Sequence, residues 1–215
     1  HTDEQVGRVI DALEDLGELD NTLIFYIVGD NGASGEGGPD GSLNEYAAYN
    51  LVPETVEEMI THLDEIGSDR LFNHYTVGWA HAMNTPYQWT KQIASHWGGT
   101  RTGMIVHWPA GIEATGEIRH QFTHVTDVGP TILAAAGLPE PTSVNGVAQK
   151  RIEGVDFSYA FDAREAAEQH STQYFEIMGN RGIYHEGWSA CTMHDVPWVL
   201  GSEGHAFPED DWELY

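Results

Sequence analysis

The feature that most constrains this chain is Gly29-Asp30-Asn31-Gly32, which directly follows the apolar run 23–28. A strand that ends in an acid and an amide presents two oxygen side chains at the carboxyl edge of a sheet, where open α/β sheets bind ligands. The flanking glycines permit a sharp turn. Carboxylate and amide oxygens suit a hard cation. The pattern therefore predicts a cation site at Asp30 and Asn31, with an ordinary Asp-Asn-Gly turn as the alternative.

The charge balance restricts the partners of this chain. Its 215 residues include 34 acidic and nine basic side chains, and the formal net charge is −25. Nucleic acids and anionic membrane surfaces require clustered Lys and Arg, so neither is an expected partner. No apolar run approaches the length of a membrane span. Cys191 is the only cysteine, which excludes an internal disulfide, and we expect it to be a small buried residue.

The first fifty residues show a clear order of elements. Apolar residues at helical spacing predict a helix over 1–16 that ends at Gly17. A continuously apolar strand over 22–28 is typical of burial on both faces. Residues 32–52 are rich in Gly, Asn and Ser and predict a long loop, and Pro53 opens the next predicted helix. This part of the chain therefore reads as helix, strand, loop and helix.

The rest of the chain changes from mixed structure to strands. Residues 67–100 are crowded with aromatic and histidine side chains and predict an irregular segment. The remaining predicted elements are a strand at 104–107, a helix from 126 or 127 to 136, a helix at 162–170, and strands at 174–178, 181–185 and 189–193. The order favours an α/β fold, a sheet flanked by helices and followed by a smaller antiparallel β region.

Several single residues could have chemical roles. Lys91, one of only two lysines, lies in the aromatic segment and could bind an anionic oxygen or form an ordinary ion pair. His96 could donate a hydrogen bond to a substrate oxygen, or could simply be packed. Gly98-Gly99 predicts a close approach of the backbone to another strand or to a ligand. We favour structural roles for Arg101, and for Asp127 as a helix cap.

These motifs, taken in order, resemble the sulfatases of the alkaline-phosphatase superfamily, particularly the bacterial arylsulfatase branch. The resemblance rests on 6–17, on 20–32, on 90–101 (Thr-Lys-Gln-Ile-Ala-Ser-His-Trp-Gly-Gly-Thr-Arg), on Trp-Pro-Ala at 108–110, on 124–133, on 180–184 and on Trp-Glu-Leu-Tyr at 212–215. It implies an alkaline-phosphatase-like sheet. Residues 1–137 would be the C-terminal part of the catalytic domain, and 138–215 a loop-rich, small antiparallel region.

The resemblance also implies a set of site residues. In sulfatases two early Asp residues and a late Asp-Asn pair hold a divalent cation, usually calcium, with magnesium possible, and Asp30 and Asn31 match the late pair. A family lysine contacts the sulfate, and Lys91 occupies its position. Many members have Glu or Gln before the two glycines, where this chain has His96-Trp97, so the chain departs from the family's pattern there, and His96 stays a candidate for substrate binding on its own chemistry. The expected substrate is a sulfate ester of a small molecule or a glycan.

One departure from the family is an absence. The motif Cys/Ser-x-Pro-Ser-Arg, whose first residue becomes formylglycine, does not occur in these 215 residues. We therefore expect the formylglycine upstream of His1, and expect this chain alone to be inactive. The alternatives are a phosphodiesterase or phosphonate monoester hydrolase, a non-catalytic paralogue that binds sulfated glycans, and a calcium-stabilised structural domain. The ester, the oligomeric state and the compartment (cytoplasm, periplasm or secreted) stay open.

Overall fold

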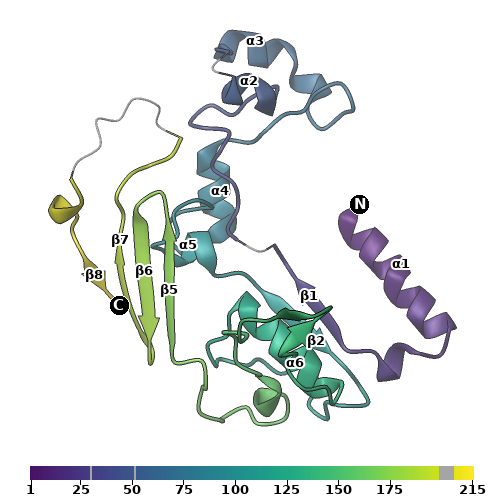
Figure 1. Ribbon diagram of the computed structural model, residues 1–215. Coiled ribbons are helices and arrows are strands. Elements are labelled where there is room, and N and C mark those ends of the chain that lie inside the picture. The colour runs from purple at the N-terminus through teal and green to yellow at the C-terminus, as the bar shows by residue number, and fades with distance from the viewer. Residues whose placement is uncertain (30, 51, 199–205) are drawn as a thin grey trace. The chain divides into compact units, whose positions relative to one another are not determined.

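The computed structural model describes residues 1–29, 31–50, 52–198 and 206–215 (Figure 1). The α-helices are α1 (Thr2–Asp15), α2 (Glu45–Tyr49), α3 (Val56–Thr61), α4 (Val77–Asn84), α5 (Trp97–Thr100) and α6 (Val128–Ala135). The strands are β1 (Ile24–Ile27), β2 (Met104–His107), β3 (Ser143–Val144), β4 (Val147–Ala148), β5 (Thr172–Ile177), β6 (Asn180–His185), β7 (Trp188–Thr192) and β8 (Glu213–Leu214). Short 3-10 turns η1 to η5 lie at Leu19–Asn21, Leu63–Glu65, Val125–Asp127, Ser158–Ala160 and Phe207–Glu209.

The chain folds into two compact units that interleave in the sequence. The first unit is His1–Val28 with Gly103–Ser171, and the second is Gly29–Thr102 with Thr172–Tyr215. Each unit is therefore made of two segments that are distant from each other in the sequence. The family domain boundary predicted between residues 137 and 138 is a different division, and it stays a prediction.

The first unit is built on α1 and on a ribbon of β1 and β2. The predicted first helix is confirmed, and Gly17 adopts the left-handed conformation just beyond its end, with φ of +72°. The two strands pair antiparallel, with Ile24 opposite His107. All four residues of β1 are only partly buried, so the expected burial on both faces is wrong for the described residues. A strand that has one neighbour keeps part of its surface exposed.

The core of the first unit includes residues of α6 and of the segment around Phe157. Phe157 is buried, and its ring meets those of Phe25 and Phe161 edge to face at 5.9 Å and 5.8 Å. Thr131 of α6 is fully buried, and its hydroxyl accepts a hydrogen bond from Phe157 N at 3.0 Å. This bond ties the helix to the segment that follows the β3–β4 hairpin.

The second unit contains an antiparallel sheet in the order β5-β6-β7-β8 (Figure 1). The three predicted strands are confirmed within two residues at each end. Tight turns at Gly179 and Gly187, both with positive φ, join them. Alternate residues of the strands such as Tyr184 and Cys191 are buried, and Ile93 of the same unit is fully buried as well.

Besides the helix predicted at 162–170, three predictions of where helices begin or are absent need correction. The helix expected at Pro53 begins at Val56, because Thr55 caps it by accepting from Glu58 N while the Glu58 carboxylate accepts from Thr55 N. The segment 67–100 contains α4 and α5 and is not wholly irregular. The loop 32–52 likewise contains α2.

The helix predicted at 162–170 does not form. The backbone carbonyls of Arg164 and Ala166 both accept hydrogen bonds from Gln121 Nε2, at 2.8 Å each. The Arg119 guanidinium binds the carbonyls of Ala160 and Phe161 just before it. These side chains take acceptors that a helix would use for its own N–H groups.

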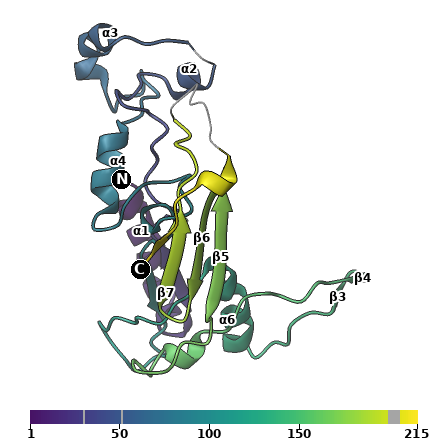
Figure 2. The ribbon, with the colours of Figure 1, turned by 90° about the vertical axis from the view of Figure 1, so that its left-hand side faces the viewer.

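Two further features concern the surface. Figure 2 shows the β3–β4 hairpin at the end of a long excursion beyond α6, and all four of its strand residues are exposed. Among the described residues there is no helix whose length and hydropathy would allow it to cross a bilayer.

Candidate functional site

The segment that follows β1 lies against the segment that contains Lys91. Gly32 N donates to Gly99 O at 3.0 Å, and Lys91 N donates to Ala33 O at 3.0 Å. Ala33 N donates to the side-chain oxygen of Asn84 at 2.9 Å. Two stretches more than fifty residues apart in sequence are therefore joined by backbone hydrogen bonds at the two residues that directly follow Asn31.

The contact between these segments depends on glycine. A Cβ on Gly32 would lie 1.7 Å from Gly98 O, and a Cβ on Gly98 would lie 2.1 Å from Gln88 O. Neither distance is possible for a real side chain, so both positions require a residue without a Cβ. The close approach predicted at Gly98-Gly99 is confirmed, and the neighbour is the chain itself.

Lys91 forms an ion pair with a loop residue. Its Nζ donates to Glu36 Oε2 at 2.8 Å, and the side chains are 34% and 15% exposed. Glu36 also accepts from Gln92 Nε2 at 3.1 Å and from Ser34 Oγ at 2.8 Å. The carboxylate thus holds the ammonium in a fixed place, with part of the lysine still open to solvent.

The pKa of Glu36 records this arrangement. Burial of the carboxyl by itself would raise its pKa. The hydrogen bonds from Lys91 and Ser34 and the attraction to the Lys91 charge outweigh burial, so the pKa lies below its ordinary value. Glu36 is therefore charged at neutral pH, and the pair with Lys91 is an ionic one.

The predicted cation ligands are only partly described. Asp30 lies outside the described residues, and Asn31 is half-buried. That Asp30, Asn31 and Lys91 face one cavity stays a prediction. The carboxylate of Asp30 and the amide oxygen of Asn31 are the kinds of ligand atom that hard divalent cations prefer. This pair of residues therefore fits calcium or magnesium.

His96 lies at the N-terminus of α5 and is 7% exposed. Its Nδ1 lies 2.8 Å from Ser95 Oγ, and its Nε2 lies 3.7 Å from Cys191 Sγ and 3.6 Å from Glu213 Oε2. Burial lowers the pKa of His96, against an opposing effect of Glu213. The ring is therefore mainly neutral at pH 7, and a contact with substrate stays a prediction.

Arg101 packs on aromatic rings. Its guanidinium carbon lies 4.6 Å from the ring centroid of Trp97 and 5.0 Å from that of Tyr87. These distances are typical of cation–π stacking. The arrangement fits the structural role that the sequence favoured, with a ring partner in place of a carboxylate.

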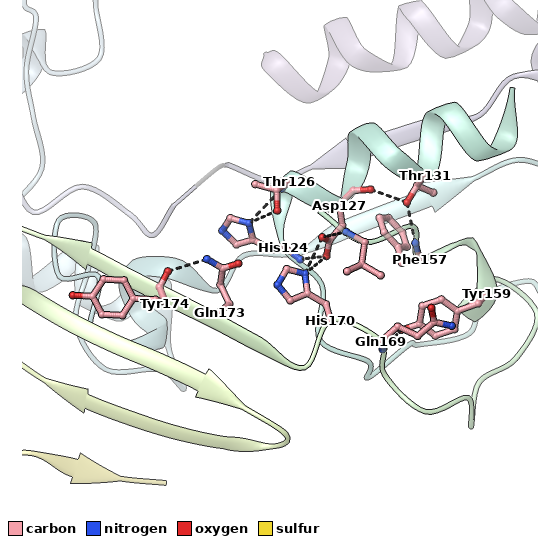
Figure 3. Close-up of polar contacts among 11 residues, drawn as sticks. His124, Thr126, Asp127, Thr131, Phe157, Tyr159, Gln169, His170, Gln173 and Tyr174 are labelled. Carbon is pink, nitrogen blue, oxygen red and sulfur yellow. Dashed lines mark hydrogen bonds and ion pairs between the residues drawn. The ribbon is translucent and has the colours of Figure 1, made fainter. Parts of the chain in front are cut away.

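Asp127 organises the polar core of the first unit (Figure 3). It occupies the N-cap position of α6 but makes no side-chain capping bond to that helix, which corrects the predicted capping role. Its fully buried carboxylate accepts from His124 N and Val155 N, each at 2.8 Å, and lies 2.8 Å from His170 Nδ1. It therefore ties together three segments, and its role is structural.

Sequence reasoning missed two of these relations. Glu36 gave no signal because it lies in a loop of mixed composition, 55 residues from Lys91. The proximity of His96 to Cys191 was also missed, since 95 residues separate them. The cysteine itself was correctly predicted to be buried.

Comparison with known proteins gives relatives of one kind. An uncharacterized sulfatase of Schizosaccharomyces pombe is 34% identical over 139 residues, which are 65% of this chain and 24% of that protein. The arylsulfatase of Klebsiella aerogenes is 30% identical over 63% of this chain and 27% of its own length. The human N-acetylgalactosamine-6-sulfatase is 26% identical over 92% of this chain and 32% of its own length. The chain thus spans about a quarter to a third of these relatives.

A solved structure supports the fold. A sulfatase from work on glycosaminoglycan metabolism by Bacteroides thetaiotaomicron matches all of this chain and 36% of its own, with a TM-score of 0.57 and 15% identity. The fold is accordingly α/β and alkaline-phosphatase-like, as the sequence predicts. The family model described as Sulfatase matches residues 1–138. By that match over more than half of its length, the chain belongs to the sulfatase family.

Proposed function

We propose that this chain forms part of the active site of a sulfate-ester hydrolase. Lys91 binds the sulfate group, and Asp30 and Asn31 hold a divalent cation, calcium or magnesium. The observation that supports this most directly is the pairing of the 32–33 and 91–99 backbones, which brings the residue after Asn31 next to the loop of Lys91. Family membership agrees with this placement.

Lys91 suits the binding of a tetrahedral anion. An ammonium group has three donors, so it can donate to a sulfate oxygen while another donor stays on Glu36. The chain has a net charge of −25, which repels anions at long range, so a local cation held in place is needed. Glu36 is then a positioning residue that keeps the ammonium oriented.

The cation and the nucleophile complete the proposed site. When bound, the cation would offset negative charge on a sulfate oxygen in the transition state. Sulfatases generally use formylglycine, and its motif is not among these 215 residues. We propose that sequence outside them provides the formylglycine, and that this chain alone therefore lacks sulfatase turnover. Hydrolysis of 4-nitrophenyl sulfate by the purified 215-residue chain would contradict that part of the proposal.

The sharpest test of the lysine compares the two lysines of the sequence. Lys91→Met retains most of the side-chain volume without the charge, and Lys150→Met makes the same change at an exposed position. Isothermal titration with sodium sulfate in the presence of calcium should show at least about tenfold weaker binding for Lys91→Met, because a hydrogen bond to a charged group is lost. Lys150→Met should bind as the unaltered chain does.

Equal losses in the two variants would refute the role of Lys91, since both remove one positive charge. The same titration with inorganic phosphate addresses the alternatives within the superfamily. Binding of phosphate much tighter than sulfate would favour a phosphodiesterase or phosphonate monoester hydrolase. For the ester itself, the names of the relatives suggest comparing an aryl sulfate with a 6-sulfated amino sugar.

A further inference from the structure

A second group of side chains lies on one face of the sheet in the second unit. Cys191 of β7 and Glu213 of β8 are directly opposite each other in an antiparallel pair. Residues opposite each other in such a pair project from the same face, with Cβ atoms about 4.5–5.5 Å apart. On the other side, Gly182 of β6 is the partner of Cys191. The row across the three strands is therefore glycine, thiol and carboxylate.

Gly182 explains how a histidine reaches this row. A Cβ at Gly182 would lie 2.8 Å from Ser95 O and 3.4 Å from Ala94 O, so the absent side chain lets the 94–96 segment pack on the sheet. His96 follows directly and is buried above the row. Three side chains from distant parts of the sequence thus converge, and their donor atoms all lie within 4.8 Å of one another.

The separations match those of a metal centre. A tetrahedral zinc ion with Zn–N of about 2.0 Å and Zn–S of about 2.3 Å places N and S about 3.5 Å apart, and N and O about 3.3 Å apart. In this structure His96 Nε2 is 3.7 Å from Cys191 Sγ and 3.6 Å from Glu213 Oε2. Both distances from His96 Nε2 are thus within a few tenths of an ångström of the values for a bound ion, and the thiol sulfur lies within 4.8 Å of the Glu213 carboxylate.

The surroundings supply the other parts of such a centre. Ser95 Oγ lies 2.8 Å from His96 Nδ1, which orients the ring and leaves Nε2 for a ligand. A cavity of about 210 Å³ adjoins the group, between the rings of Tyr87, Trp97 and Tyr215. The Glu213 side chain is half exposed, which gives an ion a route from solvent. The cavity leaves room for a water molecule as the fourth ligand.

We propose that His96, Cys191 and Glu213 form a zinc-binding site, with a water molecule from the adjoining cavity completing a tetrahedral ion. A thiolate, an imidazole and a carboxylate together favour zinc over calcium or magnesium, which prefer oxygen ligands alone. The site shares no residue with the Lys91–Glu36 pair. Its test is therefore independent of sulfate binding and of any hydrolase activity.

The protonation states make binding dependent on pH. Burial raises the pKa of Cys191 to about 11, with Glu213 adding to the effect, so the free thiol is protonated at neutral pH. Zinc must replace that proton: the S–H bond breaks, the Zn–S bond forms and the proton passes to solvent.

Cobalt(II) is the most informative probe, because thiolate bound to cobalt gives a charge-transfer absorbance. Cys191 is the only cysteine in the sequence, so any such band belongs to it, whatever the 12 histidines bind. The full 215-residue chain, freed of metals with a chelator, should develop the band on titration with cobalt. Zinc should abolish it by displacement, and the displacement gives the zinc affinity.

Substitutions then assign the ligands, with far-UV circular dichroism confirming that each variant folds. Cys191→Ser should lose the band. His96→Ala and Glu213→Gln should each keep a band but bind cobalt at least about tenfold more weakly, and Ser95→Ala about tenfold more weakly. His62→Ala, at a half-exposed histidine paired with Glu65, is the matched control and should have no effect. Glu213→Gln is the safest variant for folding, because that side chain is half exposed.

Two results would overturn the proposal. The first is the absence of a thiolate band at saturating cobalt in the folded chain. The second is a band whose cobalt dependence is the same in Glu213→Gln and His96→Ala as in the unaltered chain, because Cys191 would then act without its neighbours.

Discussion

At the scale of single residues, Asp127 shows how a pattern can predict a position correctly and its bonds wrongly. The sequence places an acid at the start of α6, and the structure confirms that placement. The carboxylate turns instead to His124 N, Val155 N and His170. Local sequence could not reveal this, because Val155 and His170 are brought near by the tertiary fold.

Asp127→Asn should therefore destabilise the first unit strongly. The amide has one oxygen in place of two, and its NH2 group would face backbone N–H groups that need an acceptor. We expect a loss of about 3 kcal/mol in the free energy of unfolding, measured by urea denaturation.

Asp162→Asn is the control for this substitution. Asp162 accepts from Glu113 N and Ala114 N at 2.8 Å through a single oxygen, at an exposed position. An asparagine oxygen can accept both bonds, so the loss should stay below about 1 kcal/mol. Similar losses in both variants would contradict a special role for the buried carboxylate.

At the scale of elements, the sequence predicts most strands and the long first helix. Apolar periodicity marks α1, and apolar runs bounded by glycine turns mark β1, β2 and the strands β5 to β7. These signals depend on neighbouring residues in the sequence, so the elements can be predicted without knowledge of the tertiary contacts. The interior of 67–100 has no such periodicity. Its helix α4 is capped by the Thr76 side chain, and Ala80 is the residue of this helix that is buried.

Some features of the candidate site could likewise be predicted from local sequence, and others could not. Lys91 stands out in the sequence because lysine is scarce, and the glycine pair marks a close approach that the structure confirms. The pairing of Glu36 with Lys91 depends on long-range packing, and so does the grouping of His96, Cys191 and Glu213. No local sequence pattern predicts either of them. The convergence on a cation stays a prediction, since Asp30 lies outside the described residues.

Two glycines in helices should respond to alanine in opposite directions. Gly7 lies in the interior of α1, and among the described residues no atom outside its own stretch of helix lies within 4 Å of an added Cβ, so Gly7→Ala should stabilise the chain by about 0.5–1 kcal/mol. Gly98 of α5 would place its Cβ against two backbone carbonyl oxygens, so Gly98→Ala should destabilise by at least about 2 kcal/mol. Urea denaturation of both variants measures the difference, and a loss in Gly7→Ala would show that α1 packs against something.

At the scale of the whole molecule, each compact unit contains a histidine that resists protonation. Burial is the main cause that lowers the pKa of His96 in the second unit. It is also the main cause that lowers the pKa of His124 in the first unit. His124 Nδ1 also accepts from Thr126 N at 3.3 Å, which a protonated ring cannot do. Acid should therefore weaken both units.

The direction of the pH effect follows from linkage. Below the ordinary histidine pKa of 6.5 the unfolded chain takes up protons before the folded chain does, so stability falls as the pH falls through 6.5 toward the lowered folded values. His124→Asn keeps an acceptor suited to the turn but does not titrate. Between pH 7.5 and 5.5 this variant should lose less stability than the unaltered chain. Thermal melting at the two pH values measures these losses of stability. Equal losses in the variant and the unaltered chain would contradict the role of His124.

The burial of Cys191 also bears on how the molecule can be studied. The only thiol of the sequence is 2% exposed, so maleimide reagents should leave the folded chain unmodified. A cysteine introduced at Val147, on the exposed β3–β4 hairpin, would then be the single reactive position. A fluorophore or spin label attached there would report from one known place on the surface.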